Sequence, residues 1–339
     1  MSRVLSGMRP TGPLHLGHFL GALENWKTLQ ERHECFFMVA DLHALMGEYE
    51  DPSEISRNSL EMVIDWLACG IDPDRSRIFV QSQVPEHAEL AVLLGMVTPL
   101  GWLERNPTYK EQLREIQGRD LTTFGFLGYP VLQAADILLY KADKVPVGQD
   151  QLAHLELTRE IVRRFNRLYK TDTLVEPKPI LTPQARILGT DRRKMSKSYG
   201  NAVNLSDPEE TIRKKVQSMI TDPARIKSSD PGHPDICNVF SYYRIFSGQG
   251  TVDAVHDWCV HARKGCTDCK QGLAEVLLEK MRPMRERRAR IERELKKDPQ
   301  MILKILDNGH TEAQNIARQT LKEVKQLMGV EAAQRGAGA

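Results

Sequence analysis

The strongest constraint on the fold is an alternation of short and long apolar patterns in the first two hundred residues. Short apolar, partly β-branched runs at 3–6, 35–41 and 77–82 have the length and composition of buried strands. Longer stretches at 20–33 and 53–70 carry apolar residues three and four positions apart, which is the period of an amphipathic helix. This alternation predicts an α/β fold with a doubly wound, Rossmann-type parallel sheet that has helices on both faces.

The pattern changes after Asp207, where helical periods continue without a convincing strand. We therefore expect an α/β domain at 1–205, an all-helical domain at 206–330 and a flexible tail at 331–339. Each of the two larger parts has the length of an ordinary domain.

Several segments outside the clearest strands and helices are also predicted. We expect helices at about 109–117 and 130–142, followed by a loop rich in Pro and Thr at 171–184. Near the end of the chain, two separate helices are expected at 299–307 and 311–328.

Composition limits the kind of protein. A net charge of +2 over 339 residues excludes a globally basic nucleic-acid binder, so any RNA contact must come from a local patch. We see neither a signal peptide nor an apolar run of the ~18–20 residues that a membrane span requires. We therefore expect a cytoplasmic protein with no membrane partner, whose six cysteines stay reduced.

The stretch "PTGPLHLGHFLGAL" at 10–23 joins the first strand to the first helix. A helix start offers unpaired N–H groups and a partial positive charge, which suits a phosphate. Gly17 allows close approach because it has no Cβ, and the imidazoles of His15 and His18 can donate hydrogen bonds to phosphate oxygens. The alternative is that the two histidines only cap the helix. The stretch matches neither the dinucleotide-binding glycine motif nor a P-loop.

A second motif, "GTDRRKMSKSYGN" at 189–201, is a basic loop. Lys194 and Lys197 lie three positions apart, with Ser196 and Ser198 between and beside them. We interpret the loop as a flexible clamp whose ammonium groups neutralise a leaving pyrophosphate. The alternatives are a solvated basic loop or a phosphorylation target.

Four of the cysteines, all in the predicted helical domain, have the spacing C-x21-C-x6-C-x2-C. In a cytoplasmic protein such a set points to tetrahedral thiolate ligation of a metal. Spacing does not choose between Zn²⁺ and an iron–sulfur cluster. We expect Cys35 and Cys69 to be small core thiols instead. The four candidate ligands are Cys237, Cys259, Cys266 and Cys269.

Taken together, "HLGH" and "KMSKS" resemble the paired motifs of class I aminoacyl-tRNA synthetases. The segments 6–26, 107–111, 129–140, 145–151 and 194–201 resemble the bacterial tryptophanyl-tRNA synthetases more closely. The resemblance implies that L-tryptophan reacts with ATP to give tryptophanyl-adenylate and pyrophosphate, and that the tryptophanyl group then passes to tRNA(Trp). It also implies a homodimer, a catalytic domain before residue 205 and an anticodon-binding domain after it.

The resemblance also implies the nucleotide site, position by position. Catalysis would rest on His15, His18, Lys194 and Lys197, with Mg²⁺ accompanying the ATP. The ATP-binding residues would be Arg9, Pro10, Thr11, Gly17, His18, Gly148, Gln149, Asp150, Ile187, Lys194, Met195, Ser196, Lys197 and Ser198.

In the implied tryptophan site, Asp136 would accept a hydrogen bond from the indole N–H, which can only donate. The alternative for Asp136 is an ordinary salt bridge. Tyr129 and Gln151 would hold the α-amino group, and His43 would lie near the indole. Gln133 stands where many tryptophan enzymes carry Met and where the tyrosine enzymes tend to carry Gln, so a tyrosyl-tRNA synthetase remains the alternative. Gln149 replaces a common Glu and removes one negative charge near the nucleotide.

A subset of these synthetases has a similar four-cysteine pattern that binds [4Fe–4S], and the resemblance therefore implies this cluster, with zinc or four unligated thiols as the alternatives. The cluster would hold the anticodon-reading domain in shape.

A basic stretch at 282–297 is either a solvated helix or an RNA contact. A remaining alternative is a non-catalytic iron–sulfur RNA-binding or sensor paralogue.

Overall fold

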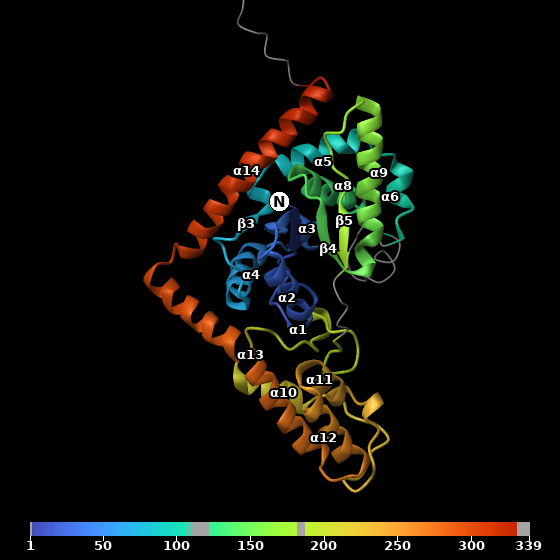
Figure 1. Cartoon of the computed structure of the whole chain (residues 1–339), viewed down its shortest axis with the longest axis vertical. Helices are drawn as coiled ribbons and strands as arrows, with labels where there is room; N and C mark the ends of the chain where they lie inside the picture. Colours follow the sequence, from blue (N-terminus) through green and yellow to red (C-terminus); the bar gives the residue numbers. More distant parts are fainter. Residues whose placement is uncertain (1, 108, 110–121, 182–186, 331–339) are drawn as a thin grey trace, which may run out of the picture.

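The computed structural model describes residues 2–107, 109, 122–181 and 187–330. Within them, a parallel sheet with the order β3-β2-β1-β4-β5 forms the centre of the α/β region (Figure 1). The direction of winding changes between β1 and β4, and ligands of such sheets bind outside the carboxyl ends of the strands at this point. The strands are β1 (Arg3–Met8), β2 (Glu34–Val39), β3 (Ser76–Val80), β4 (Lys144–Val147) and β5 (Lys178–Leu181).

Both faces of the sheet are buried, as expected for a parallel sheet. Because successive side chains point to opposite faces, Val4, Phe37 and Ile78 share one core cluster with helices α2 (Glu24–Leu29) and α4 (Ile55–Cys69).

The opposite face carries the second core cluster, which includes Leu5, Phe36 and Phe79. Most of the helical residues in this cluster come from α5 (Glu86–Val97), α8 (Phe124–Leu139), α9 (Leu152–Tyr169) and α14 (Met301–Leu327). The short helices around the sheet are α1 (Leu16–His18), a π-helical turn (Phe19–Leu23), α3 (Asp41–Glu48) and α6 (Leu100–Glu104).

The region after residue 205 is helical, and the predicted fold class is confirmed. Its first helices gather below the sheet in Figure 1, while α13 leads back from them toward the sheet. These helices are α10 (Glu209–Gln217), α11 (Asn238–Phe246), α12 (Gln249–Val260) and α13 (Cys266–Lys297). No described helix is both long and apolar enough to cross a membrane.

The last helix belongs to the same core as the sheet, because α14 packs against β3 and α5. A Cβ on Gly309 would lie 2.1 Å from the carbonyl oxygen of Ile78, so glycine is needed for this approach. The predicted division of this stretch into two helices is wrong, since the close packing keeps α14 continuous through Gly309. The domain boundary near 205 stays a prediction, and the predicted tail at 331–339 lies outside the described residues.

Two strands were missed by the sequence analysis. β4 and β5 have only four residues each and contain Pro146 and Pro179, which argue against strands. Pro179 is tolerated because β5 is an edge strand, and β5 falls in the segment predicted as a loop.

Helix α8 begins at Phe124, six residues before the predicted start, because the side chain of Thr123 caps it. Most of the helix predicted at 109–117 lies outside the described residues.

Candidate active site

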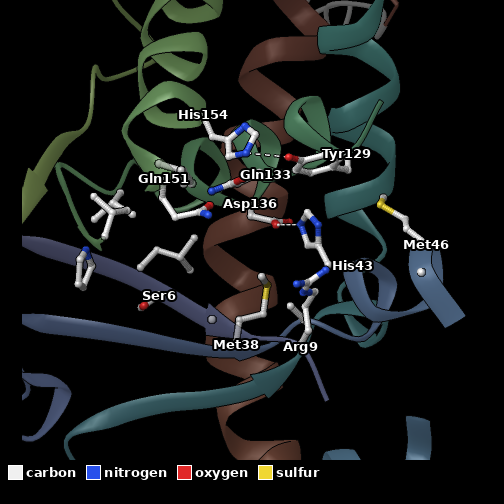
Figure 2. A pocket seen from close by; sticks show the side chains of 18 of the residues that line it. Ser6, Arg9, Met38, His43, Met46, Tyr129, Gln133, Asp136, Gln151 and His154 are labelled. Carbon is white, nitrogen blue, oxygen red and sulfur yellow. Dashed lines mark hydrogen bonds and ion pairs between the residues drawn. The ribbon is translucent and has the colours of Figure 1, made fainter. Parts of the chain in front are cut away.

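A cavity of about 310 Å³ opens at the carboxyl ends of β1 and β4, where the winding of the sheet changes (Figure 2). All five residues predicted for the tryptophan site lie in its wall, and so does Arg9. Helix α8 contributes Tyr129, Gln133 and Asp136 from positions three and four apart, which places them on one helical face. Helix α3 supplies His43, and the turn after β4 supplies Gln151.

Asp136 is buried at the inner end of this cavity, with an exposed fraction of 2%. Its Oδ1 accepts a hydrogen bond from Gln81 Nε2 at 2.8 Å and lies 2.6 Å from His87 Nδ1. Its Oδ2 lies 2.8 Å from His43 Nε2 (Figure 2). Burial alone would raise the pKa of this carboxyl, but the bonds from His43 and His87 and their charges lower it to about 2. Asp136 is therefore a fixed, ionised acceptor.

His154 also lies in the wall of the cavity, where it contacts Tyr129. The sequence analysis did not predict this residue. Its Nδ1 lies 3.0 Å from Asn106 Nδ2, and its Nε2 lies 2.7 Å from the Tyr129 hydroxyl (Figure 2). Burial lowers the pKa of His154 to about 4, so the ring is neutral near pH 7. An amide nitrogen can only donate, so Nδ1 accepts and the ring proton on Nε2 points to Tyr129. The position of His154, three residues after Gln151 in the first turn of α9, was the available signal.

His15 and His18 cap the first helix, as one of the two interpretations of this stretch proposed. The Nδ1 of His15 accepts from Gly17 N at 3.1 Å, and the Nδ1 of His18 accepts from His15 N at 3.1 Å. Burial, followed by the charge of Lys197, lowers the pKa of His15 to about 4, and burial holds the pKa of His18 well below its usual value. Neutral rings whose Nδ1 atoms accept must carry their protons on Nε2. Capping therefore leaves each ring one N–H group to donate.

The basic loop at 189–201 contacts the segment that precedes the first helix. Lys197 Nζ donates to the carbonyl oxygen of Gly12 at 2.7 Å, and burial, then the charge of Arg9, lowers the pKa of Lys197 to about 8. Asn201 holds the loop in shape, since its Oδ1 accepts from Ser196 N at 2.8 Å and its Nδ2 donates to Lys194 O at 3.1 Å. Asn201 was within the quoted motif but was not predicted as a site residue.

The remaining predicted nucleotide residues lie around these two motifs. Ile187 is buried beside Gly17, where an added Cβ would lie 3.5 Å from it and 2.9 Å from the His15 ring. Met195 is buried and Lys194 is exposed. The structure also places the following predicted residues at the ends of β1 and β4: Pro10, Thr11, Gly148, Gln149 and Asp150. The side chain of Ser198 lies outside the described residues.

The four predicted metal ligands gather at the ends of α11, α12 and α13. Burial raises the pKa of Cys269 to about 12, and the thiols of Cys237, Cys259 and Cys266 add to this effect. A Cβ on Gly232 would lie 2.4 Å from Cys259 Sγ, so a glycine is needed beside this thiol. Among the described residues, no group of three or more His, Cys, Asp or Glu side chains is spaced to hold a metal ion.

Residues 1–281 match the family described as tRNA synthetases class I (W and Y). The chain belongs to this family. It is 49% identical over 328 residues to the tryptophan–tRNA ligase of Thermotoga maritima, covering 96% of this chain and 98% of the relative. It is 44% identical over 396 residues to that of Aquifex aeolicus, covering 96% and 99%.

As a class I tRNA synthetase, the chain also resembles a solved structure over nearly its whole length. Tryptophanyl-tRNA synthetase from Campylobacter jejuni, complexed with ADP and tryptophan, is 33% identical with a TM-score of 0.86, covering 96% of this chain and 99% of that one. The predicted family and enzyme class, an ATP-dependent aminoacyl-tRNA ligase, are confirmed.

Proposed function

We propose that this synthetase is a tryptophan–tRNA ligase, which activates L-tryptophan with ATP and transfers the tryptophanyl group to tRNA(Trp). The observation that carries this proposal is Asp136, a buried and ionised carboxylate at the inner end of the cavity. Indole has one N–H donor and no acceptor, which suits an acceptor that cannot donate. A site built around such a bond rejects side chains that lack the donor, because the carboxylate would be left unpaired.

The rest of the cavity would orient the amino acid. His43 shares Asp136 Oδ2 and lies beside the proposed indole position. Tyr129 and Gln151 would hold the α-amino group, with Tyr129 fixed in place by His154. Gln133 also faces the cavity, where its amide can pair with a phenol, so tyrosine is the competing substrate that the experiment must include.

Activation requires alignment and stabilisation of phosphate charge rather than a base. The carboxylate of tryptophan is already ionised when it attacks the α-phosphorus of ATP, and the bond to pyrophosphate breaks as the new bond forms. The Nε2–H groups of His15 and His18 would donate to phosphate oxygens as their charge grows. Lys194 and Lys197 would neutralise the departing pyrophosphate, which Mg²⁺ would accompany. The remaining predicted nucleotide residues would enclose the adenosine.

The helical region after residue 205 would read the anticodon of tRNA(Trp) in the cytoplasm. Helix α13 carries a series of exposed basic side chains along its second half, which suits a phosphate backbone. This feature supports RNA contact but does not by itself select one tRNA.

We also propose a homodimer. Val92 and Met96, four residues apart on α5, are 59% and 74% exposed, and Leu100 at the start of α6 is 58% exposed. Large exposed apolar side chains on one helix face favour association with another protein surface. The family resemblance favours a second copy as the occupant. Light scattering should show a dimer, and Met96→Glu should produce monomers, whereas a monomeric parent protein would contradict the proposal.

We further propose that the four cysteines hold a [4Fe–4S] cluster that stabilises the helical region. Two observations support the proposal, because burial and the thiols of Cys237, Cys259 and Cys266 raise the pKa of Cys269, and Arg225 donates to Cys266 Sγ at 3.9 Å. The family resemblance favours a cluster over zinc, so zinc is the alternative that the experiment must include.

The deciding experiment is amino-acid-dependent exchange of pyrophosphate into ATP, measured on anaerobically purified protein with tryptophan and with tyrosine. We expect exchange with tryptophan and none above background with tyrosine. Selective exchange with tyrosine would show that Gln133, and not Asp136, decides the substrate. Folded protein that exchanges with neither would favour the non-catalytic sensor paralogue.

A further inference from the structure

His87 is a buried histidine that contacts the proposed indole acceptor without being part of the cavity wall. It lies in the first turn of α5, and its exposed fraction is 0%. Its Nδ1 lies 2.6 Å from the Oδ1 of Asp136, and its Nε2 lies 2.7 Å from the hydroxyl of Tyr140. Because each ring nitrogen has a partner, the imidazole is held in one orientation.

The two oxygens of the Asp136 carboxylate have different surroundings. Oδ1 contacts His87 at 2.6 Å and Gln81 Nε2 at 2.8 Å, and neither of these side chains lines the cavity. Oδ2 lies 2.8 Å from the Nε2 of His43, which does line the cavity. Each carboxylate oxygen accepts about two hydrogen bonds. Oδ1 is therefore fully used inside the protein, and Oδ2 has a position left for a donor in the cavity.

The direction of the bond between His87 and Asp136 follows from the charge of the carboxylate. An ionised carboxylate only accepts, so the Nδ1 of His87 carries a proton. A hydroxyl can donate or accept, so Tyr140 satisfies Nε2 in either protonation state of the ring. His87 therefore supplies a donor to Asp136 whether or not the imidazole is charged.

The position of the His87 ring is set by β3 and α14 as well as by α5. The ring lies beside Phe79 of β3, with ring centroids 6.0 Å apart and an angle of 28° between the planes. The neighbouring Glu86 is buried and accepts from Arg318 at 3.0 Å and from Gln314 at 3.2 Å, both of them on α14. The start of α5 is therefore anchored, and the imidazole is in place before a substrate binds.

We infer that His87 is a positioning residue that sets the selectivity for a ring N–H, because its bond to Oδ1 keeps Asp136 an acceptor and leaves Oδ2 for the substrate. This inference rests on the proposed function, since it assumes that Asp136 receives the donor of the substrate side chain. A purely structural histidine would instead support the packing of α5 against α8 without affecting which amino acid is activated.

The test uses two amino acids that differ in one donor. β-(3-Benzothienyl)alanine has sulfur in place of the indole N–H and nearly the same shape as tryptophan. The ratio of kcat/KM for tryptophan to kcat/KM for this analogue therefore measures the contribution of the N–H. Pyrophosphate exchange gives this ratio for each full-length protein.

The variants separate the two contacts of the imidazole. In His87→Asn the short amide reaches the position of Nδ1 and keeps a donor for Asp136, whereas in His87→Gln the longer amide reaches the position of Nε2. Tyr140→Phe is the control, because it removes the hydroxyl beside Nε2 and leaves the donor to Asp136 in place.

We expect the parent protein to prefer tryptophan over the analogue by about 100-fold or more. His87→Gln should reduce this preference about tenfold, because kcat/KM falls for tryptophan and not for the analogue. His87→Asn and Tyr140→Phe should stay within about threefold of the parent ratio. The kcat/KM for ATP, measured at saturating tryptophan, should be the same in all four proteins.

A folded His87→Gln variant with the parent ratio would overturn the inference. An equal fall in kcat/KM for both amino acids would also overturn it, and so would an equal loss of the ratio in Tyr140→Phe. If His87→Gln does not fold, as judged by circular dichroism, His87→Leu takes its place.

A parent protein that activates tyrosine instead of tryptophan would contradict the proposed function. The same variants would then be compared with tyrosine and phenylalanine, which also differ by one donor. Loss of that discrimination in His87→Gln alone would support the role of His87, and its retention would overturn it.

Discussion

The Nδ1 of His87 lies 2.6 Å from the Oδ1 of Asp136, and both side chains are buried. The Nε2 of His87 lies 2.7 Å from the hydroxyl of Tyr140, whose pKa is raised well above its usual value by burial and by the charge of Asp136. The ionised carboxylate of Asp136 can only accept, so the Nδ1–H of His87 points toward Oδ1. With Gln81 also bonded to Oδ1, the carboxylate has a fixed orientation, and its Oδ2 is left to His43 and the substrate.

Replacing Asp136 by Asn should selectively damage tryptophan activation. The neutral amide loses a charge-assisted acceptor, so kcat/KM for tryptophan should fall by about 10- to 100-fold, while ATP binding by calorimetry should stay unchanged. Gln133→Met is the control in the same helix and should keep tryptophan-dependent exchange. Normal tryptophan kinetics in Asp136→Asn would remove the basis of the substrate assignment.

Replacing Gly17 by Ala should damage the nucleotide site, because the added Cβ would lie 2.9 Å from the His15 ring. Displacing that ring should lower kcat/KM for ATP by about tenfold or more. Gly21→Ala, a change of the same size four residues later, meets no atom within 4 Å and should leave exchange kinetics intact. Equal kinetics of the two variants would argue that residues 15–18 serve only as a helix cap.

Lys197 should impose an alkaline limit on the first step. Its pKa is lowered to about 8 by burial and by Arg9, so the charged form is present below that pH and is lost above it. In the free enzyme, kcat/KM for ATP should therefore decline as the pH rises through about 8. Lys197→Arg, which stays protonated, should lack this decline over the same range. A pH profile that is identical in both proteins would exclude Lys197 as its source.

The cysteine group should bind iron with matched sulfide. Anaerobically purified protein should contain both, as measured by elemental and acid-labile sulfide analysis, and Cys259→Ser should lose them along with thermal stability. Cys35→Ser is the control, because Cys35 is buried in the sheet, away from the group. Stoichiometric zinc without sulfide would establish the alternative, and parent protein without either metal would contradict the proposed site.

Much of the site was predictable because its signals are local. The helix-start motif around His15 and the basic loop around Lys197 are continuous in sequence, and Asp136 lies on a strongly helical apolar segment. Their substrate roles stay predictions until they are measured. The strands β4 and β5 could not be predicted, because four residues that include a proline carry too little pattern. Only the pairing of β4 with β1 and of β5 with β4 defines them.

The sequence by itself determined the alternation of strands and helices, the family, and the two motifs expected to bind ATP, since apolar period and short motifs are properties of neighbouring residues. Only the tertiary structure decided that His87 orients Asp136, that His154 orients Tyr129, and that Asp65 pairs with Arg288. These partners are separated by 25 to 223 residues. Their contacts depend on how the helices pack across the sheet, which no local pattern records.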